Sequence, residues 1–392
     1  MIGTPRTVKS FCQKFDQIVL HKTHRARLRQ YLTGLVAPAE HKDISRLSEV
    51  TAVDLQALHH FLVNSDWDDN GVNESRIKML QQNDSTRATE SGVLIVDDTG
   101  DKKKGNHTDC VARQYIGRLG KVDNGIVCVT THYADSKKHY PLSVEIYTPE
   151  SRLEGGKSNP EFATKPQIAL KLIDRAIGLG VRFCAVVTDC FYGSSEVFLD
   201  GLFERRLKFV VALRPSQGAW HKEGEEHPLC ATVEFWNKRG WRVLSYRDAD
   251  GKLQKRYVAQ CELGDCQVVM VTREEANLEN ADVLLTNLNR DALEVARLYY
   301  LRNWVEVFYK QAKNQFGWSD FQVRDRHAII RHWIRVMCAW TICMRYALSG
   351  GVTRLRRSGE KIRTLAAGNE WDTGSASLVE NAHRCLASCA IA

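Results

Sequence analysis

Short apolar runs rich in β-branched residues recur between positions 93 and 213, and they constrain the fold more than any other feature of this 392-residue chain. The runs cover 93–96, 126–133, 140–147, 183–187 and 209–213. Runs of this length between turn residues predict buried strands. Helical patterns over 165–177 and 195–206 separate the later runs, and Gly178 and Gly180 end the first of these helices. Three strands, a helix, a strand, a helix and a strand predict an α/β domain with a mixed sheet.

The segments on both sides of this pattern have different periodicities. Apolar residues recur at helical spacing before residue 88, for example at Phe11, Phe15 and Val19, and basic residues gather over 22–29. This predicts a helical N-terminal domain, 1–88, with a basic face. Segment 214–288 has only strand patterns, at 242–246, 254–262, 266–272 and 282–286, and predicts a β-rich insertion of a domain that spans 89–348. Helical periodicity returns over 291–348 with a break near 317–321, and a basic tail follows over 349–392.

Composition narrows the class of protein only modestly. Apolar residues make up 43% of the chain, which suffices for a folded core, and the length predicts two or three domains. The net charge of +8 favours a polyanionic partner. The 12 cysteines form no CxxC pair, so the usual zinc spacing is missing. No stretch reaches the ~18 apolar residues that span a bilayer, and no signal peptide is visible. We therefore expect a soluble, cytoplasmic protein without membrane contact.

Acidic residues follow two of the predicted strands. Asp97 and Asp98 come directly after 93–96, and Asp189 comes after the run that ends at Thr188. Open α/β sheets usually carry their sites at these carboxyl ends. A third acid, Glu306, lies in a helical pattern. Gathered carboxylates repel each other unless a cation compensates, and hard divalent cations prefer oxygen ligands. If the fold gathers these acids, they predict a two-ion centre for in-line displacement at phosphorus.

The helical pattern around Glu306 carries a polar stripe. Tyr299, Arg302, Glu306 and Lys313 would fall within a wedge of roughly 60° on one continuous helix, at 100° per residue. A solvated charged face would produce the same spacing. Apolar residues at 301, 304, 305 and 308 place the stripe beside a buried region.

Together these motifs resemble those of bacterial insertion-sequence transposases of the DDE superfamily. The spacing Tyr299-x2-Arg302-x3-Glu306-x6-Lys313 resembles their Y-R-E-K signature. Segment 93–100 resembles their first-aspartate strand, in which the metal-binding Asp precedes Thr, and 186–189 followed by Tyr192-Gly193 resembles the second. A β-rich insertion between the second Asp and the Glu is also typical of the group. The resemblance covers about 90–345 and is looser in the helical N-terminal part.

The resemblance implies an RNase H-like catalytic fold and a transposase that cuts at element ends and joins the 3′-hydroxyl to target DNA. It implies two Mg²⁺ ions, which Mn²⁺ can replace, held by Asp98, Asp189 and Glu306. Arg302 and Lys313 would contact DNA phosphates, and Tyr299 would help to hold the terminal phosphate. The implied partners are terminal inverted repeats, target DNA and a second copy of the chain in a homodimer that pairs two ends. The N-terminal helices would read the DNA.

Several choices stay open at the level of the sequence. Neighbours on a strand point to opposite faces, so only one of Asp97 and Asp98 should reach the metals, and the Asp-Thr match favours Asp98. Trp220, Trp236 and Trp241 lie in or beside the insertion, where relatives place a base-stacking aromatic, but buried structural roles fit them better. The lysines at 102–104 follow the first aspartates and fit either DNA contact or a solvated surface.

Two other functions compete with a transposase. A catalytically inactive, transposase-derived DNA-binding protein would keep the basic helices, but it has no reason to keep the acidic triad that is intact here. A different RNase H-like nuclease would share the fold and the acids, but it would not require the Y-R-E-K spacing.

Overall fold

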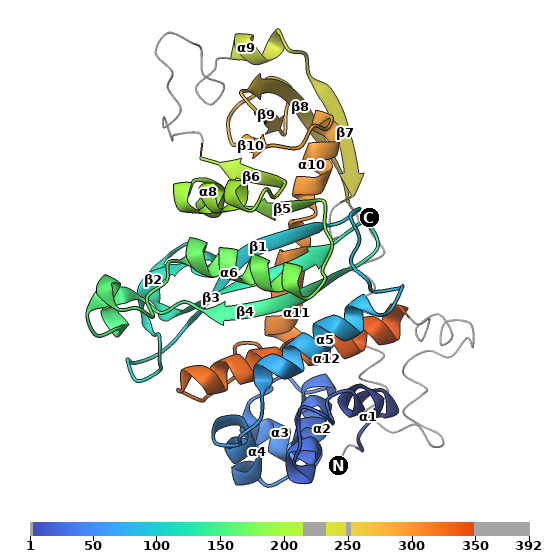
Figure 1. The fold of residues 1–392 in the computed structure, drawn as a ribbon, viewed down its shortest axis with the longest axis vertical. Helices are drawn as coiled ribbons and strands as arrows, with labels where there is room; N and C mark the ends of the chain where they lie inside the picture. Colours follow the sequence, from blue (N-terminus) through green and yellow to red (C-terminus); the bar gives the residue numbers. More distant parts are fainter. Residues whose placement is uncertain (1–2, 215–232, 248–251, 349–392) are drawn as a thin grey trace.

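The fold is built on one mixed sheet, and the computed structural model describes it over residues 3–214, 233–247 and 252–348. The sheet has ten strands in the order β2-β3-β1-β5-β6-β10-β9-β8-β7, with β4 paired to β3 (Figure 1). The strands are β1 (Val93–Lys102), β2 (Ala112–Ile116), β3 (Lys121–Ala134), β4 (His139–Ile146), β5 (Ala185–Thr188), β6 (Phe209–Leu213), β7 (Arg242–Arg247), β8 (Leu253–Leu263), β9 (Cys266–Thr272) and β10 (Asp282–Thr286). The mixed α/β class expected from the sequence is confirmed, because β1, β5 and β6 run parallel while β3 and β4 are antiparallel additions.

Helices cover both faces of the sheet. They are α1 (Arg6–Gln13), α2 (Lys22–Val36), α3 (Ile44–Thr51), α4 (Leu55–Val63), α5 (Asp69–Gln81), α6 (Lys165–Gly178), α7 (Cys190–Gly193), α8 (Glu196–Glu204), α9 (Val233–Asn237), α10 (Ala292–Tyr300), α11 (Asn303–Gln315) and α12 (Arg326–Leu348). Helix α6 packs on β3 and β4 and against α8, while α11 and α12 contact β1 and β4 from the other side (Figure 1). The sheet is therefore the middle layer of three.

The strands of the insertion do not form a sheet of their own. Strand β10 pairs with the outer edge of β6, and β9, β8 and β7 follow in order, so these strands extend the central sheet. Strands were expected at these positions and are found there, but a β-rich insertion did not by itself predict that they would continue the central sheet. The physical reason for the difference is the edge of β6, whose unpaired backbone groups offer a ready place for a further strand.

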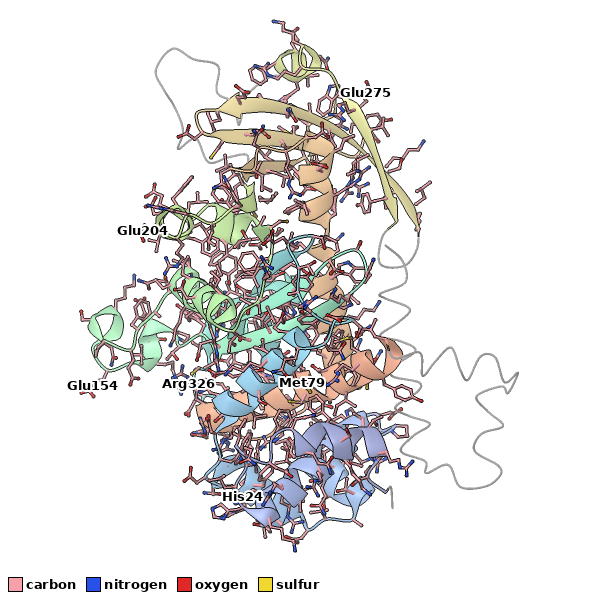
Figure 2. All side chains as sticks on the ribbon, turned by 45° about the vertical axis from the view of Figure 1, so that its right-hand side comes forward. His24, Met79, Glu154, Glu204, Glu275 and Arg326 are labelled. Atoms are coloured by element: carbon pink, nitrogen blue, oxygen red, sulfur yellow. The ribbon has the colours of Figure 1, made fainter. Side chains whose placement is uncertain are left out.

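The N-terminal helices are attached to the sheet through α12 and through α5, which contacts β4 directly. Helix α12 contacts β4 as well as α1, α2, α4 and α5. Its first residue, Arg326, which Figure 2 labels, pairs with Glu145 of β4 at 2.7 Å. Within this layer the guanidinium of Arg335 lies 4.8, 4.7 and 4.5 Å from the rings of Tyr31, Phe61 and Trp67. Such cation–π contacts stabilise a charge that burial would otherwise disfavour, so the α12 layer joins helices far apart in sequence.

Strand β1 is longer than the apolar run that predicts it. Its parallel pairing with β5 ends at Val96 and Thr188, whereas its antiparallel pairing with β3 continues to Lys102. Asp97 and Asp98 therefore lie within β1, at the point where β5 stops and a gap opens beside it. Asp189 follows β5 directly, so the first and second acidic positions meet at this gap.

The helical stripe from Tyr299 to Lys313 is interrupted, which corrects the expectation of one continuous helix. Helix α10 ends at Tyr300 and α11 begins at Asn303. The amide groups of Leu301 and Arg302 bond three residues back, to Leu298 and Tyr299, so the chain is more tightly wound here than in an α-helix. Tyr299 consequently belongs to a different helix from Glu306 and Lys313.

Two expectations from the sequence concern membrane contact and the segments outside the described ranges. No helix in the described ranges is long and apolar enough to cross a membrane. The C-terminal tail, 349–392, lies outside the described residues, as does Trp220.

The close approach of α7 to β6 explains the glycine that follows Tyr192. A Cβ added at Gly193 would lie 2.0 Å from the carbonyl oxygen of Ala212 and 3.0 Å from Cβ of Val211. We expect Gly193→Ala to lower the free energy of unfolding by about 1–3 kcal/mol, because α7 must move away from β6. Urea denaturation measures the effect. Gly178→Ala is the matched control, since nothing lies within 4 Å of its added Cβ; equal stability of the two variants would contradict the prediction.

Candidate active site

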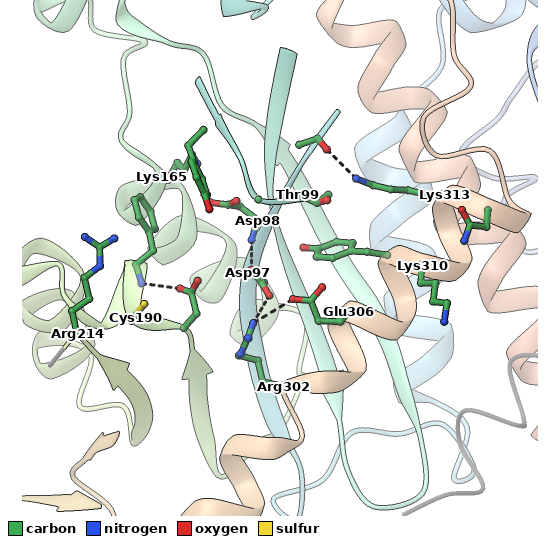
Figure 3. A pocket seen from close by; sticks show the side chains of 17 residues that line it. Asp97, Asp98, Thr99, Lys165, Cys190, Arg214, Arg302, Glu306, Lys310 and Lys313 are labelled. Carbon is green, nitrogen blue, oxygen red and sulfur yellow. Dashed lines mark hydrogen bonds and ion pairs between the residues drawn. The ribbon is translucent and has the colours of Figure 1, made fainter. Parts of the chain in front are cut away.

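An open pocket lies where β1 and β5 diverge, and α11 forms one of its walls (Figure 3). Four acidic side chains line it, and cationic side chains surround them. The charged lining residues are Asp97, Asp98, Asp189, Glu306, Lys165, Arg214, Arg302, Lys310 and Lys313. Acids from β1, from the residue after β5 and from α11 thus share one pocket with groups that suit phosphate.

Asp97 is the most enclosed of the four acids. Its Oδ1 accepts the amide of Asp98 at 2.7 Å, and its Oδ2 accepts Nη1 of Arg302 at 2.7 Å. The same Nη1 lies 3.7 Å from Oε1 of Glu306, so one guanidinium nitrogen reaches both carboxylates (Figure 3). Burial raises the pKa of Asp97 well above its usual range, and Arg302 acts against this rise. Both oxygens of Asp97 are therefore engaged within the protein.

Asp98 points to the opposite face of β1, as the alternation along a strand requires. Its Oδ2 lies 3.0 Å from Nζ of Lys165, the first residue of α6. Burial raises the pKa of Asp98 and Lys165 lowers it. The side chain of Asp98 is 22% exposed, against 10% for Asp97. The carboxylate of Asp98 is thus the more accessible of the neighbouring pair.

Asp189 and Glu306 complete the acidic group from different elements. Asp189 caps the short helix α7, and its Oδ1 accepts the amides of Phe191 and Tyr192 at 3.0 and 3.4 Å. The charge of Asp189 raises the pKa of both Asp97 and Asp98, so it acts on each of the neighbouring aspartates. Glu306 lies in the first turn of α11, and its side chain is 62% exposed. A long, exposed side chain can turn within the pocket.

Two residues of the sequence signature lie deeper than the others. Tyr299 is buried and is not part of the pocket lining; burial raises its pKa to about 12, while the neighbouring Arg302 lowers it. Lys313 lines the pocket, but its ammonium group is 3.0 Å from Asp101 Oδ1 and donates to the carbonyl of Gly100 at 3.0 Å. The expected DNA contacts of Tyr299 and Lys313 stay predictions.

Three further residues of the site escaped the sequence analysis. Lys310 lines the pocket and is exposed; its position one turn after Glu306 was a signal that helical spacing could have revealed. Asp101, which pairs with Lys313, also accepts a hydrogen bond from Ser319 at 2.7 Å. Lys165 is far from Asp98 in the sequence, and no motif links the two. Only the packing of α6 on the sheet brings them together.

The structure shows the surroundings of two tryptophans and two lysines whose roles the sequence did not decide. Trp236 is buried in the core, as a structural role requires, and Trp241 is partly buried and donates to Asn237 at 2.7 Å. Lys102 pairs with Asp123 at 2.8 Å, and Lys103 lies 3.5 Å from the ring centre of Phe321. Two lysines of the 102–104 cluster are thus engaged with the protein itself.

The pocket suits a hard divalent cation in the kind of donor it offers. Carboxylate oxygens are the preferred ligands of Mg²⁺. As the side chains lie, no group of three or more His, Cys, Asp or Glu in the described part of the chain could hold a metal ion. Lys165 and Arg302 instead neutralise Asp98 and Asp97. The donors fit a cation if Asp98 exchanges Lys165 for it and Glu306 turns inward.

Comparison with known proteins gives two matches. Residues 11–229 match a family described as "DDE superfamily endonuclease". The chain is also 30% identical, over 350 residues, to a probable transposase for insertion sequence element IS701 from Microchaete diplosiphon, and the match covers 85% of this chain and 87% of that protein. The family match includes both aspartate positions and ends before α10, so the segment from Tyr299 to Lys313 lies outside it.

The buried pair between Asp101 and Lys313 generates a stability prediction. Both side chains are almost fully enclosed, and the pair joins α11 to β1. We expect Asp101→Asn to lower the free energy of unfolding by about 3–5 kcal/mol, because the Lys313 ammonium group would lose its buried counter-charge. Chemical denaturation measures this loss, and adding Lys313→Met to Asp101→Asn should recover part of it.

Asp123→Asn is the control for this experiment, because it removes an acid that pairs with Lys102 at the surface. Exposed pairs contribute little to stability. If Asp101→Asn and Asp123→Asn unfolded at the same denaturant concentration, the Asp101–Lys313 pair would have no structural importance.

Proposed function

We propose that this chain, which belongs to the DDE superfamily of endonucleases and to its insertion-sequence transposases, cuts DNA at the ends of its element and joins the freed ends to target DNA. The observation that carries the proposal is the pocket beside β1, where acids from three separate elements lie among cations that suit phosphate. A protein that only bound DNA would gain nothing from gathering four carboxylates in one place, because they repel each other and the DNA.

Asp98, Asp189 and Glu306 are the proposed metal ligands. Asp98 is the more exposed of the neighbouring aspartates, while both oxygens of Asp97 already hold the Asp98 amide and Arg302. Asp97 is thus a positioning residue that fixes Arg302 beside Glu306. Mg²⁺ is the proposed cation, with Mn²⁺ as a substitute, and bound divalent ions would supply positive charge to the oxygens of an in-line displacement.

The reaction has two displacements at phosphorus. In the first, an oxygen of water forms a bond to phosphorus and the bond to the 3′ oxygen breaks, which leaves a 3′-hydroxyl and a 5′-phosphate. In the second, that hydroxyl attacks a phosphorus of target DNA, and a target 3′ oxygen leaves with a proton. Arg302 and Lys310 bind the phosphate oxygens, because a guanidinium fork and an exposed ammonium group both match phosphate. Lys313 adds its charge from the pocket wall, where Asp101 holds it.

The partners in this proposal are DNA and a second copy of the chain. The substrates are the terminal inverted repeats of the element and target DNA, and a homodimer pairs the two ends. The basic N-terminal helices contact DNA outside the cleavage site. Cleavage takes place in the cytoplasm, where bacterial DNA lies.

Loss of the ligand carboxylates should separate this function from that of an inactive DNA-binding relative. We expect Asp189→Ala and Glu306→Ala to reduce cleavage of the element's own ends in Mg²⁺ by more than about 100-fold. Loss of a residue that only supports a metal ligand typically costs about 10–100-fold in activity, and loss of a ligand itself should cost more. Electrophoretic assays of cleavage and of binding measure both properties, and binding should persist. Glu294→Ala on α10, which is not part of the pocket lining, is the control. Undiminished cleavage by either acidic variant would refute the assignment.

The effect of pH on stabilisation by Mg²⁺ tests which aspartate is the ligand. Burial raises the pKa of Asp98 above the ordinary 3.8, so its ionised form destabilises the folded protein once the pH rises past this pKa. A bound cation offsets that cost. We therefore expect Mg²⁺ to raise Tm where Asp98 is ionised and to have a progressively smaller effect as the pH falls through its raised pKa, measured by thermal unfolding over a series of pH values.

Asp98→Asn should remove most of this Mg²⁺ effect, whereas Asp97→Asn should retain it, because Asp97 serves as the counter-ion of Arg302. The reverse result, with the Mg²⁺ effect lost only in Asp97→Asn, would transfer the ligand role to Asp97.

A further inference from the structure

An exposed aromatic residue lines the pocket without any role in the chemistry described above. Tyr115 lies on β2, the edge strand of the sheet, and is 58% exposed. Its partner across the β2–β3 ladder is Val122, which is 51% exposed. Partners in an antiparallel ladder carry their side chains on the same face. The hairpin therefore presents a tyrosine and a valine side by side to solvent.

Tyr115 belongs to the wall of the same pocket that contains the acids. Helix α11 contributes Glu306, Lys310 and Asn314 to the same lining, at intervals of four residues. Residues four apart share one face of a helix, and these three are exposed. The pocket thus offers a carboxylate, a cation and an amide along α11, together with the aromatic ring of Tyr115 on the β2–β3 hairpin.

These groups match the chemistry of a single DNA strand. An aromatic ring beside an apolar side chain stacks on a nucleobase, and nearby cations hold the backbone. Arg113, two residues before Tyr115 and therefore on the same face of β2, adds an exposed cation. A protein partner fits less well, because a stable interface buries about 800 Å² on each side, far more than two side chains present.

We propose that Tyr115 forms a stacking site for one unpaired nucleobase of the DNA strand that occupies the pocket. The phenol ring stacks on the base, Val122 packs against the edge of the stack, and Arg113 and Lys310 lie near the adjoining phosphates. This inference rests on the proposed function, since it assumes that DNA enters the pocket. It assigns Tyr115 to holding a strand end in place, and it assigns no bond-breaking step to this residue.

The test uses the full chain in EDTA, so that no cleavage accompanies binding. The probe is a short duplex with a single-stranded dT overhang and 2-aminopurine at one overhang position at a time. Stacking of one base is worth about tenfold in affinity, so Tyr115→Ala should bind about tenfold more weakly by fluorescence anisotropy. Tyr115→Phe and Tyr115→Trp keep a ring and should bind within about twofold of the parent. At one overhang position, 2-aminopurine should be quenched by the parent and not by Tyr115→Ala.

Phe203→Ala is the matched control, since Phe203 is an exposed aromatic residue on α8 that is not part of the pocket lining. Placing an abasic nucleotide at the quenched position should abolish the difference between the parent and Tyr115→Ala. A tenfold difference that persisted with abasic nucleotides at every position would overturn the proposal, as would unchanged affinity of Tyr115→Ala. So would a shift in oligomeric state with unchanged binding, which would assign Tyr115 to a contact between copies. Failure of the proposed chemistry would look different, because Asp189→Ala and Glu306→Ala would then still cleave.

Discussion

The contact of Arg302 with Asp97 and Glu306 is the interaction on which the arrangement of this site depends. Three charges meet there beside a buried strand, and those of the largely buried Arg302 and Asp97 would each be costly alone. Burial by itself would lower the pKa of Arg302, yet the neighbouring carboxylates, Asp97 first, raise it above its ordinary value. The guanidinium thus stays charged and fixes the start of α11 against β1. Together with the Lys313–Asp101 pair further along α11, this contact links the helix that carries Glu306 to the strand that carries the aspartates.

The geometry of β1 determines how the charges are distributed around this contact. Because successive side chains alternate, Asp97 and Asp101 face α11 while Asp98 faces α6. Each face has its own cations: Arg302 and Lys313 on one side, and Lys165 on the other. One strand therefore holds two helices at fixed positions through ion pairs. Asp98 remains the more accessible of the two neighbouring aspartates.

The same arrangement suits an enzyme that must handle a long polyanion. The acids line an open pocket together with exposed polar groups of α11 and with Tyr115 of the β2–β3 hairpin. Membership of the DDE superfamily confirms the family that the sequence resembles and agrees with the mixed sheet of an RNase H-like fold, while the Y-R-E-K signature stays a prediction. The α12 layer joins the N-terminal helices to this sheet through buried contacts such as those of Arg335, so the helical part is held firmly relative to the pocket.

The sequence by itself determined most of the strands and helices and the acidic positions, because these depend on local periodicity and on short motifs; strand β2 was not among its predictions. Strands β9 and β10 were predicted residue for residue, and Asp98, Asp189 and Glu306 all line one pocket. Only the tertiary structure decided that the insertion extends the central sheet, that the helix breaks after Tyr300, and that Lys165 and Asp101 join the site. The extension of the sheet and the ion pairs depend on strand edges and charges that are far apart in the sequence. Asp98 and Lys165, for example, are 67 residues apart. Contacts between such distant residues produce no periodic pattern in the sequence, because burial and charge compensation decide them as the chain folds.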